Sequence, residues 1–304
     1  MGELFDEPVL RAVTVLALGA AVHVGAALSF ARSGPRRVVC WALACAAPFV
    51  TYLAPADLTI WRFVIVLPGV LCLFHIIDLH RDRRELTPGL RVWFVLTPFD
   101  TRKTRRVPRE LRPRLVLTIL GWGLVSFASF WSLFHPPALA GLPGPLVRWA
   151  TGMVTFYSTV EVVGAGIEQL YLLGGIQTPL LHRNPALARS VQEFWGERWN
   201  LEIRRWLYLH TFLPLARRRR MALGVLAAFG ASTLLHIWVV LPSTDWRMAG
   251  LWAIFFFSQG LIILVERRLE VARWPRPLAH AWTVSMLLGT SPLFAEPMLR
   301  VISV

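Results

Sequence analysis

One histidine stands inside a run of the sequence that is otherwise almost wholly apolar. In "MALGVLAAFGASTLLHIWVVL", residues 221–241, His236 is the only ionisable side chain. Burial disfavours the imidazolium, so a neutral ring is expected near pH 7. A neutral imidazole can accept a proton from a hydroxyl group, which is the task of a general base. Ser232 precedes it by four residues and shares its helix face, so its hydroxyl is expected to bond the ring or line the same cavity.

A structural role for His236, in which the ring bonds a neighbouring helix, is the alternative that this run leaves open. The 16 residues from Arg220 to His236 correspond to about 24 Å at helical rise. In a straight helix the imidazole therefore lies well past the cytoplasmic surface. A water-soluble donor molecule would need a tunnel to reach it.

A second stretch, "SVQEFWGERWNLEIRRWLYLHTFLPLARRRR" at residues 190–220, combines aromatic residues with charges. Its apolar residues recur at helical spacing, with Glu and Arg interleaved. This pattern is typical of a helix that lies at the membrane interface or inserts partly into the membrane. Asn200 carries an uncharged carboxamide that both donates and accepts hydrogen bonds. Such a group is cheaper than a charge to carry toward a cavity in the membrane.

The composition indicates that a membrane surrounds both stretches. Of the 304 residues, 55% are hydrophobic and only 16% are charged, whereas a soluble domain usually carries about 25% charged residues. A spanning helix needs about 20 mostly apolar residues. Pro292 and Pro297 are expected to break the last span. The sequence predicts eight spans, at roughly 9–31, 38–54, 58–77, 115–134, 146–174, 221–241, 247–265 and 278–302.

The basic residues sort onto alternate loops. Of the 32 Lys and Arg, 27 fall in the segments 32–37, 78–114, 182–220 and 266–277, and the loops between the other spans carry none. Because cytoplasmic loops are rich in Lys and Arg, this alternation predicts eight spans with both termini on the non-cytoplasmic side. The net charge of +14 then favours anionic lipid headgroups, and no nucleic-acid partner is expected.

The predicted fold is all-α: a polytopic membrane helical bundle of about eight transmembrane helices, with interfacial or re-entrant helices on the cytoplasmic side. No internal repeat is evident, so a single membrane-embedded domain is expected over 1–304, with 78–114 and 182–220 as its cytoplasmic-side segments. "GLRVWFVLTPFDTRKTRR" in the first segment suits an interfacial helix. The acidic start "MGELFDEP" predicts no cleavable signal peptide.

The lysine content and the cysteines lead to two further expectations. Lys103 is the only Lys in the sequence, which suggests a GC-rich bacterial genome and places this multi-pass protein in a bacterial inner membrane. Cys40, Cys45 and Cys72 lie in apolar runs and are expected to be small core residues, with no disulfide and no metal site. No basic neighbour favours a thiolate, so a Cys nucleophile is not expected.

Taken together, the two stretches resemble the paired signature of the membrane-bound O-acyltransferases. The likeness is to the wax synthase branch, whose motif runs Phe-Trp-Gly-Arg-Arg-Trp, and to the Phe-Tyr-x-Asp-Trp-Trp-Asn of the sterol and diacylglycerol acyltransferases. Asn200 and His236 stand 36 residues apart, as in that family. The likeness covers residues 190–240, and the matching residues are Phe194, Trp195, Gly196, Arg198, Trp199, Asn200, Phe229, Ser232 and His236.

Two positions depart from the family pattern. Glu197 stands where wax synthases usually have Arg, although the other branch has Asp there. Thr233 follows Ser232 where the family commonly has Gly or Ala. A branched residue there would narrow the space beside the histidine and so limit the size of the acceptor.

The resemblance implies an acyl-CoA-dependent O-acyltransferase. Such an enzyme moves an acyl group, a fatty acyl group by the wax synthase likeness, from CoA to the hydroxyl of a lipophilic acceptor such as a long-chain alcohol. His236 would be the general base, and Asn200 would orient the reactants or polarise the thioester carbonyl, since an amide N–H can stabilise an oxyanion. The implied partners are acyl-CoA as co-substrate, a hydroxyl-bearing lipid or small molecule, and membrane lipids, with no cofactor.

The predicted substrate-binding residues surround this pair. The aromatic side chains would seat the segment, and the arginines would meet the CoA phosphates, which Arg recognises bidentately. Arg217–Arg220 could do the same or could flank the lipid surface. The predicted set is Trp195, Trp199, Arg198, Ser232, Glu168, Arg204 and Arg205.

Two other classes of function remain open. Glu161 and Glu168 lie seven residues apart on one face of the fifth span, and with His236 they could form the proton relay of a membrane transporter. Glu168 could equally line a tunnel or make a structural hydrogen bond. Transporters often contain paired repeats, and none is evident in this sequence. A non-catalytic membrane scaffold is the third class.

Overall fold

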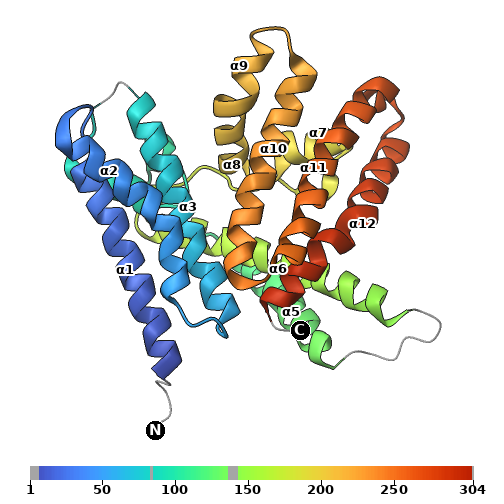
Figure 1. Ribbon diagram of the computed structural model, residues 1–304. Coiled ribbons are helices and arrows are strands. Elements are labelled where there is room, and N and C mark those ends of the chain that lie inside the picture. Colours follow the sequence, from blue (N-terminus) through green and yellow to red (C-terminus); the bar gives the residue numbers. More distant parts are fainter. Residues whose placement is uncertain (1–6, 83–84, 136–142, 303–304) are drawn as a thin grey trace. The chain divides into compact units, whose positions relative to one another are not determined.

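The computed structural model describes residues 7–82, 85–135 and 143–302 (Figure 1). The acidic start at 1–6 and most of the predicted loop at 135–145 lie outside the described residues. The chain divides into two compact units. The first comprises Met1–Thr101, Ile237–Ala249 and Val301–Ser303, and the second comprises Arg102–His236, Gly250–Arg300 and Val304. The expectation of a single domain stays a prediction.

The first unit is built from helices that pack through small residues. Ala26 of one helix and Cys40 of the next are fully buried, and Phe94 fills the space beside them. Cys72 lies in the same core, so the predicted core role is confirmed for two cysteines, whereas Cys45 is exposed. The helices are α1 (Glu7–Ser29), α2 (Gly34–Ala46), the 3-10 helix η1 (Ala47–Leu53), α3 (Thr59–Arg81), α4 (Pro88–Leu96) and the 3-10 helix η6 (Leu241–Ser243).

The predicted helix in the segment 78–114 is α4. Thr87 caps it by accepting the backbone N–H of Leu90, and the helix ends at Leu96. The chain then forms the 3-10 turn η2 (Thr101–Lys103) and a two-residue strand, β1 (Arg105–Arg106), which pairs antiparallel with β2 (Ile176–Gln177).

The second unit contains the stretch 190–220 and residues 221–236 of the apolar run. Residues 190–220 form five short helical segments, and two of them are π-helical. The elements that lie wholly or mostly in this unit are α5 (Pro113–Phe134), α6 (Gly144–Leu173), η3 (Pro185–Leu187), α7 (Val191–Glu193), the π-helix η4 (Phe194–Arg198), α8 (Leu201–Leu207), the π-helix η5 (Tyr208–Phe212), α9 (Leu213–Ala216), α10 (Met221–Val240), α11 (Trp246–Leu269), η7 (Val271–Arg273) and α12 (Arg276–Val301).

The protein is an all-α integral membrane protein. Six helices among the described residues are long and apolar enough to cross a membrane, and they coincide with six of the eight predicted spans. The other two predicted spans are helical, as α6 and α12, but they are not among the six. The six are Pro8–Ser29, Gly34–Leu53, Thr59–Arg81, Pro113–Phe134, Met221–Ser243 and Trp246–Leu269.

The predicted break in the last span is wrong, because α12 continues through Pro292 and Pro297. A proline inside a helix frees the carbonyl four residues earlier. For Pro292 this is the carbonyl of Leu288, and the hydroxyl of Ser291 donates to it over 2.8 Å. Hydroxyl side chains of this kind let membrane helices tolerate proline.

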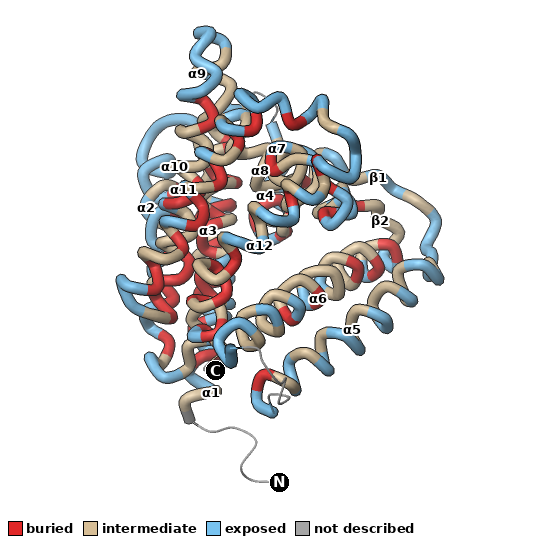
Figure 2. The backbone as a smooth tube through the Cα atoms, turned by 90° about the vertical axis from the view of Figure 1, so that its right-hand side faces the viewer, coloured by how far each residue is buried: buried red, intermediate tan, exposed pale blue. Residues whose placement is uncertain are grey.

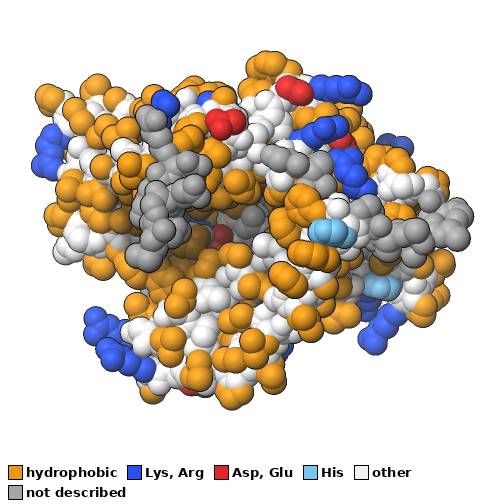
Figure 3. Space-filling model, turned by 90° about the horizontal axis from the view of Figure 1, so that it is seen from below, with side chains coloured by type: hydrophobic (Ala, Val, Ile, Leu, Met, Phe, Trp, Pro, Cys, Tyr) orange, Lys and Arg blue, Asp and Glu red, His pale blue; other side chains and the backbone are white. Residues whose placement is uncertain are grey.

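The two helices α5 and α6 lie side by side in the second unit (Figure 2). Along α5 only Leu133 is buried, and large apolar side chains such as Leu117 and Leu124 are exposed. Hydrophobic side chains also cover much of the face seen in Figure 3. Such exposed apolar surface is expected where side chains meet lipid rather than water.

Candidate active site

The imidazole of His236 has a defined proton position in α10. Its Nδ1 lies 2.7 Å from the backbone carbonyl oxygen of Ser232, one turn earlier. A carbonyl oxygen only accepts hydrogen bonds, so Nδ1 carries the proton and the neutral ring keeps its lone pair on Nε2. The Ser232 hydroxyl lies 3.4 Å from the same Nδ1. Nε2 has no hydrogen-bond partner among the described residues, so this nitrogen is available to accept a proton.

Two aromatic side chains of α11 hold the plane of this imidazole. Phe256 stacks on it with 3.4 Å between ring centroids, and Trp252 meets it edge-on at 5.5 Å. The indole N–H of Trp252 donates to the carbonyl oxygen of Phe294 in α12. The ring of His236 is therefore held by two rings of α11, one of which is itself bonded to α12.

The start of the segment that carries the aromatic motif is hydrogen-bonded to a buried carboxylate. Glu266 of α11 is 3% exposed, and its oxygens accept the backbone N–H groups of Val191 and Gln192 over 2.7 and 2.9 Å. The indole of Trp282 donates to the same carboxylate. The first N–H groups of a helix have no partner within the helix. The carboxylate of Glu266 accepts two of them and so fixes the start of α7.

Within the motif, Glu193 and Arg198 form a cross-link. The Arg198 guanidinium donates to Glu193 over 2.8 Å and to the carbonyl oxygens of Arg183 and Asn184 over 3.1 Å each. Burial opposes the ionisation of Glu193, but the N–H of Arg189 and the guanidinium of Arg198 outweigh it, so the pKa of this carboxyl lies below its usual value. Arg198 therefore joins the two ends of the motif turn.

The motif residues "FWGER" adopt a π-helix rather than an α-helix, with the N–H of Trp199 bonded to the carbonyl of Phe194. The wider turn carries Trp195 onto α11, where its indole N–H donates to Gln259 over 3.3 Å. Gln259 is ten residues from Leu269, the end of α11, or about 15 Å along the helix axis. The tryptophan thus contacts the interior of a spanning helix, and π-helical turns of this kind are frequent at functional sites.

Asn200 follows the π-helix in a left-handed conformation, with φ of 40°. Asparagine is one of the few non-glycine residues that visit this region often. Its side chain caps α8 by accepting the N–H of Ile203 over 3.4 Å. A backbone N–H can bond only to the amide oxygen, so the capping contact occupies Oδ1. The Nδ2 amide group has no hydrogen-bond partner among the described residues and remains free to donate.

A closed series of ring contacts, here called the aromatic circuit, links the surroundings of the two candidate catalytic residues. Each ring centroid lies between 3.4 and 6.0 Å from the next. The predicted meeting of His236 with Asn200 stays a prediction, but the residue next to Asn200 belongs to the circuit. In order, its members are His236, Phe256, Trp195, Phe194, Trp199, Phe156, Phe294 and Trp252.

The other predicted arginines lie on α8. The guanidinium of Arg204 sits over the ring of Tyr208 at 5.1 Å. Arg205 lies 3.5 Å from the carboxylate of Glu202, which also accepts from Lys103 over 3.3 Å. Two cations thus contact one carboxylate at this end of the segment.

One glutamate of α6 has a charged partner. Glu168 lies 3.5 Å from the guanidinium of Arg112, so the structural contact considered for it is present. Glu161 follows Tyr157 by one helical turn, and the ring of Tyr157 stacks on Trp199. These contacts tie α6 to the neighbouring segments.

Three residues with clear roles in this site were not predicted. Gln259 and Glu266 are polar residues on an apolar helix, and the rule that selects His236 could have selected them as well. His182 receives the backbone N–H of Asn200 on its Nδ1, and no pattern in the sequence marks it. Its role depends on two segments that meet only in the folded chain.

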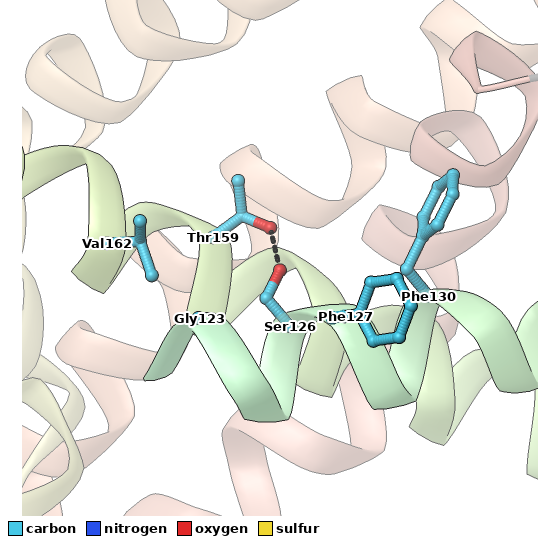
Figure 4. A pocket seen from close by; sticks show the side chains of 6 residues that line it. All are labelled: Gly123, Ser126, Phe127, Phe130, Thr159 and Val162. Carbon is cyan, nitrogen blue, oxygen red and sulfur yellow. Dashed lines mark hydrogen bonds between the residues drawn. The ribbon is translucent and has the colours of Figure 1, made fainter. Parts of the chain in front are cut away.

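A shallow groove on the second unit lies apart from these residues (Figure 4). It has a volume of about 310 Å³. Ser126 of α5 and Thr159 of α6 hydrogen-bond across it over 2.8 Å. None of the predicted site residues lines it. The lining residues are Gly123, Ser126, Phe127, Phe130, Thr159 and Val162, and their largely apolar character suits contact with lipid chains.

The part of the chain that carries this site resembles known proteins. Residues 178–258 match the membrane bound O-acyl transferase family. A protein of Arabidopsis thaliana named probable long-chain-alcohol O-fatty-acyltransferase 2 is 31% identical over 46% of this chain and 44% of its own length. The long-chain-alcohol O-fatty-acyltransferase of Simmondsia chinensis is 31% identical over 38% of this chain and 36% of its own.

A relative from the sterol branch is more distant. The acyl-CoA–sterol O-acyltransferase 1 of Arabidopsis thaliana is 23% identical over 49% of this chain and 47% of its own length. The chain thus spans less than half the length of each of these curated relatives. The resemblance to the membrane-bound O-acyltransferases that the two sequence stretches suggest is confirmed: the segment 178–258 matches that family, and enzymes named long-chain-alcohol O-fatty-acyltransferases are among the relatives.

Proposed function

We propose that this protein is an acyl-CoA-dependent O-acyltransferase that esterifies a lipophilic alcohol with a fatty acyl group. The observation that carries the proposal is the 2.7 Å contact between His236 Nδ1 and the carbonyl oxygen of Ser232. This contact assigns the proton to Nδ1 and leaves the Nε2 lone pair without a partner among the described residues. This is the arrangement that a general base for a hydroxyl group requires. The similarity to enzymes named long-chain-alcohol O-fatty-acyltransferases supports the alcohol acceptor.

In the proposed reaction, Nε2 of His236 takes the hydroxyl proton as the alcohol oxygen bonds to the thioester carbonyl carbon. The carbonyl electron pair moves onto its oxygen and forms a tetrahedral oxyanion. When the oxyanion collapses, the carbon–sulfur bond breaks and CoA leaves as a thiolate, which takes the proton back from Nε2. A thioester is already activated, so no acyl-enzyme is required.

Asn200 supplies the oxyanion donor in this proposal. Its Oδ1 is occupied by the N–H of Ile203, which directs Nδ2 away from α8. A fixed amide donor stabilises developing negative charge without reorganising. The aromatic circuit would provide apolar walls around the reacting groups, and low polarity strengthens such a hydrogen bond.

The donor is proposed to enter from the cytoplasmic side, where the basic segments lie by the positive-inside rule. Arg204, Arg205 and Lys103 are proposed to meet the CoA phosphates, and Arg205 and Lys103 both lie at the carboxylate of Glu202. We further propose eight spans, with α6 and α12 crossing the membrane and residues 190–220 as the re-entrant segment, both termini on the non-cytoplasmic side, and a bacterial inner membrane as the location. Acyl-CoA serves as co-substrate, and no cofactor is required.

The test is acyl transfer by protein purified in detergent. Labelled acyl-CoA is supplied with alcohols of different chain length and with a sterol, and ester product is measured for the wild type, His236→Ala and Asn200→Ala. We expect losses in kcat of about 100-fold to 10,000-fold for His236→Ala and of about 100-fold to 1,000-fold for Asn200→Ala. His280→Ala is the matched control, because His280 is another helix histidine bonded to a backbone carbonyl.

Ester formation at the wild-type rate by a folded His236→Ala variant would contradict the assignment of the base. A wild-type protein that transfers no acyl group to any acceptor, but carries protons or solutes across vesicle membranes, would instead support a transporter that uses Glu161, Glu168 and His236.

A further inference from the structure

The backbone at Asn200 is held by a short strap, residues 181–183, that runs beside the end of the motif. The N–H of Arg183 donates to the carbonyl of Arg198 over 2.8 Å, and the N–H of Leu201 donates to the carbonyl of Leu181 over 2.9 Å. Between these two backbone bonds, the N–H of Asn200 donates to Nδ1 of His182 over 3.2 Å. The side chain of His182 thus makes the middle bond of three.

This contact determines the protonation of His182. An atom that accepts a hydrogen bond from an N–H must carry a lone pair. Nδ1 is therefore unprotonated, and the neutral ring holds its proton on Nε2. Burial lowers the pKa of His182 to about 4, which keeps the ring neutral near pH 7. The tautomer is the opposite of that of His236, whose Nδ1 donates to Ser232. His182 is therefore unsuited to accept a proton from substrate, and its Nδ1 serves the protein backbone.

The ring of His182 is itself fixed in place. It packs on the indole of Trp199 with 4.7 Å between centroids, and it lies beside Gly164 of α6. Trp199 is in turn stacked on Phe194. A rigid acceptor is thus presented to the N–H of the residue that carries the carboxamide.

We propose that His182 is the positioning residue for the Asn200 carboxamide, acting through its hydrogen bond to the Asn200 backbone. Asn200 is in the left-handed region, where a non-glycine residue needs support from its surroundings. A change in φ at Asn200 would swing the side chain and move Nδ2 from the line along which it meets the thioester oxygen. The inference rests on the proposed acyl transfer, because Asn200 has its role only in that reaction.

Two pairs of substitutions separate the hydrogen bond from the packing. His182→Phe keeps a ring against Trp199 but removes the acceptor. His182→Asn removes the ring but places an oxygen at the same number of bonds from Cα as Nδ1. His182→Gln places its acceptor one bond further away, so Asn and Gln form a second pair that does not depend on how well the Phe variant folds.

The measured quantities are kcat, the KM for acyl-CoA and the thermal unfolding midpoint in detergent. We expect the Phe and Gln variants to lose about 10-fold to 100-fold in kcat, the scale that a misplaced reacting group costs, with KM within about twofold. His182→Asn should keep at least about a third of the wild-type kcat. In an Asn200→Ala background the His182 substitutions should add little, since coupled residues are non-additive.

His280→Phe is the matched control. It removes a histidine Nδ1 bond to the carbonyl of Ala188, on the same stretch of chain but away from Asn200, and should change kcat by no more than about threefold. The inference is overturned if His182→Phe stays active while His182→Asn is inactive, or if all variants match the wild type. It is also overturned if the loss of kcat in each variant is no larger than the loss of folded protein. Absence of transfer by the wild type would overturn the proposed function instead. The positioning bond is then tested by amide exchange, where Asn200 N–H should be protected in the wild type and in His182→Asn, and exposed in His182→Gln.

Discussion

The Nδ1 atom of His236 lies 2.7 Å from the backbone carbonyl oxygen of Ser232, and the two residues are one turn apart in α10. The helix itself therefore sets the tautomer of the imidazole. Many catalytic histidines are oriented by a carboxylate, which in a membrane interior would bring the cost of a buried charge. A main-chain acceptor orients the ring without that charge.

Substitution of Ser232 tests which of its atoms orients the imidazole. Because the closer contact is to the main chain, Ser232→Ala should preserve the tautomer and keep at least about a fifth of the wild-type kcat, whereas loss of the base costs about 100-fold or more. The measurement is initial rate of ester formation with saturating acyl-CoA. A fall in kcat as large as that of His236→Ala would show that the hydroxyl, 3.4 Å away, carries the role.

The hydrophobic pattern was enough to predict most of the fold. Six predicted spans appear as apolar helices, since twenty apolar residues in a row have few other stable arrangements. The predicted break at Pro292 was wrong because the hydroxyl of Ser291 bonds the carbonyl that this proline frees. That contact depends on the side-chain conformation of Ser291.

Much of the candidate site was visible in the sequence as residue types and spacing, but its geometry was not. The π-helical turn brings Trp195 to Gln259, and the left-handed Asn200 is bonded to His182. Trp195 and Gln259 are 64 residues apart in the sequence, and Asn200 and His182 are 18 residues apart. Local propensity cannot specify such conformations, because tertiary bonds select them.

Gln259 should be important for stability as well as for the position of the motif. It is fully buried, and it accepts from Trp195 and donates to Thr290 over 3.1 Å. Gln259→Met keeps the volume but leaves the indole N–H without an acceptor, which costs about 1–3 kcal/mol for a buried group. We expect a lower thermal unfolding midpoint in detergent, followed by intrinsic fluorescence.

A double-variant cycle provides the control for Gln259. Trp195→Phe removes the donor, so the combined variant should be less destabilised than the sum of the two single variants. Strict additivity would mean that the indole and the amide do not interact in solution.

The protonation of His182 predicts a pH dependence of stability. Burial lowers its pKa from 6.5 to about 4 in the folded protein, so the unfolded chain binds a proton more readily. The stabilisation is fully present above pH 6.5 and is lost as pH falls from 6.5 toward 4. Glu193, whose folded pKa is also lowered, contributes in the same direction below pH 4.5. The unfolding midpoint should fall over this range.

The contribution of His182 is isolated by comparison with His182→Asn. This variant lacks the titrating ring, so its midpoint should fall less steeply between pH 6.5 and pH 4 than that of the wild type. Parallel curves for the two proteins would mean that His182 does not hold a depressed pKa.

The packing of α10 on α11 can be tested at two glycines. A Cβ added to Gly260 would lie 2.9 Å from the Cβ of Phe229, one of the residues of the family motif, so Gly260→Ala should destabilise the protein by about 1–3 kcal/mol through overpacking. Gly230 is also inside a helix, but a Cβ there meets no atom within 4 Å. Gly230→Ala should therefore be neutral or stabilising by up to about 1 kcal/mol, because alanine favours helix over glycine. Equal midpoints for the two variants in a thermal unfolding series would contradict the close approach of α11 to Phe229.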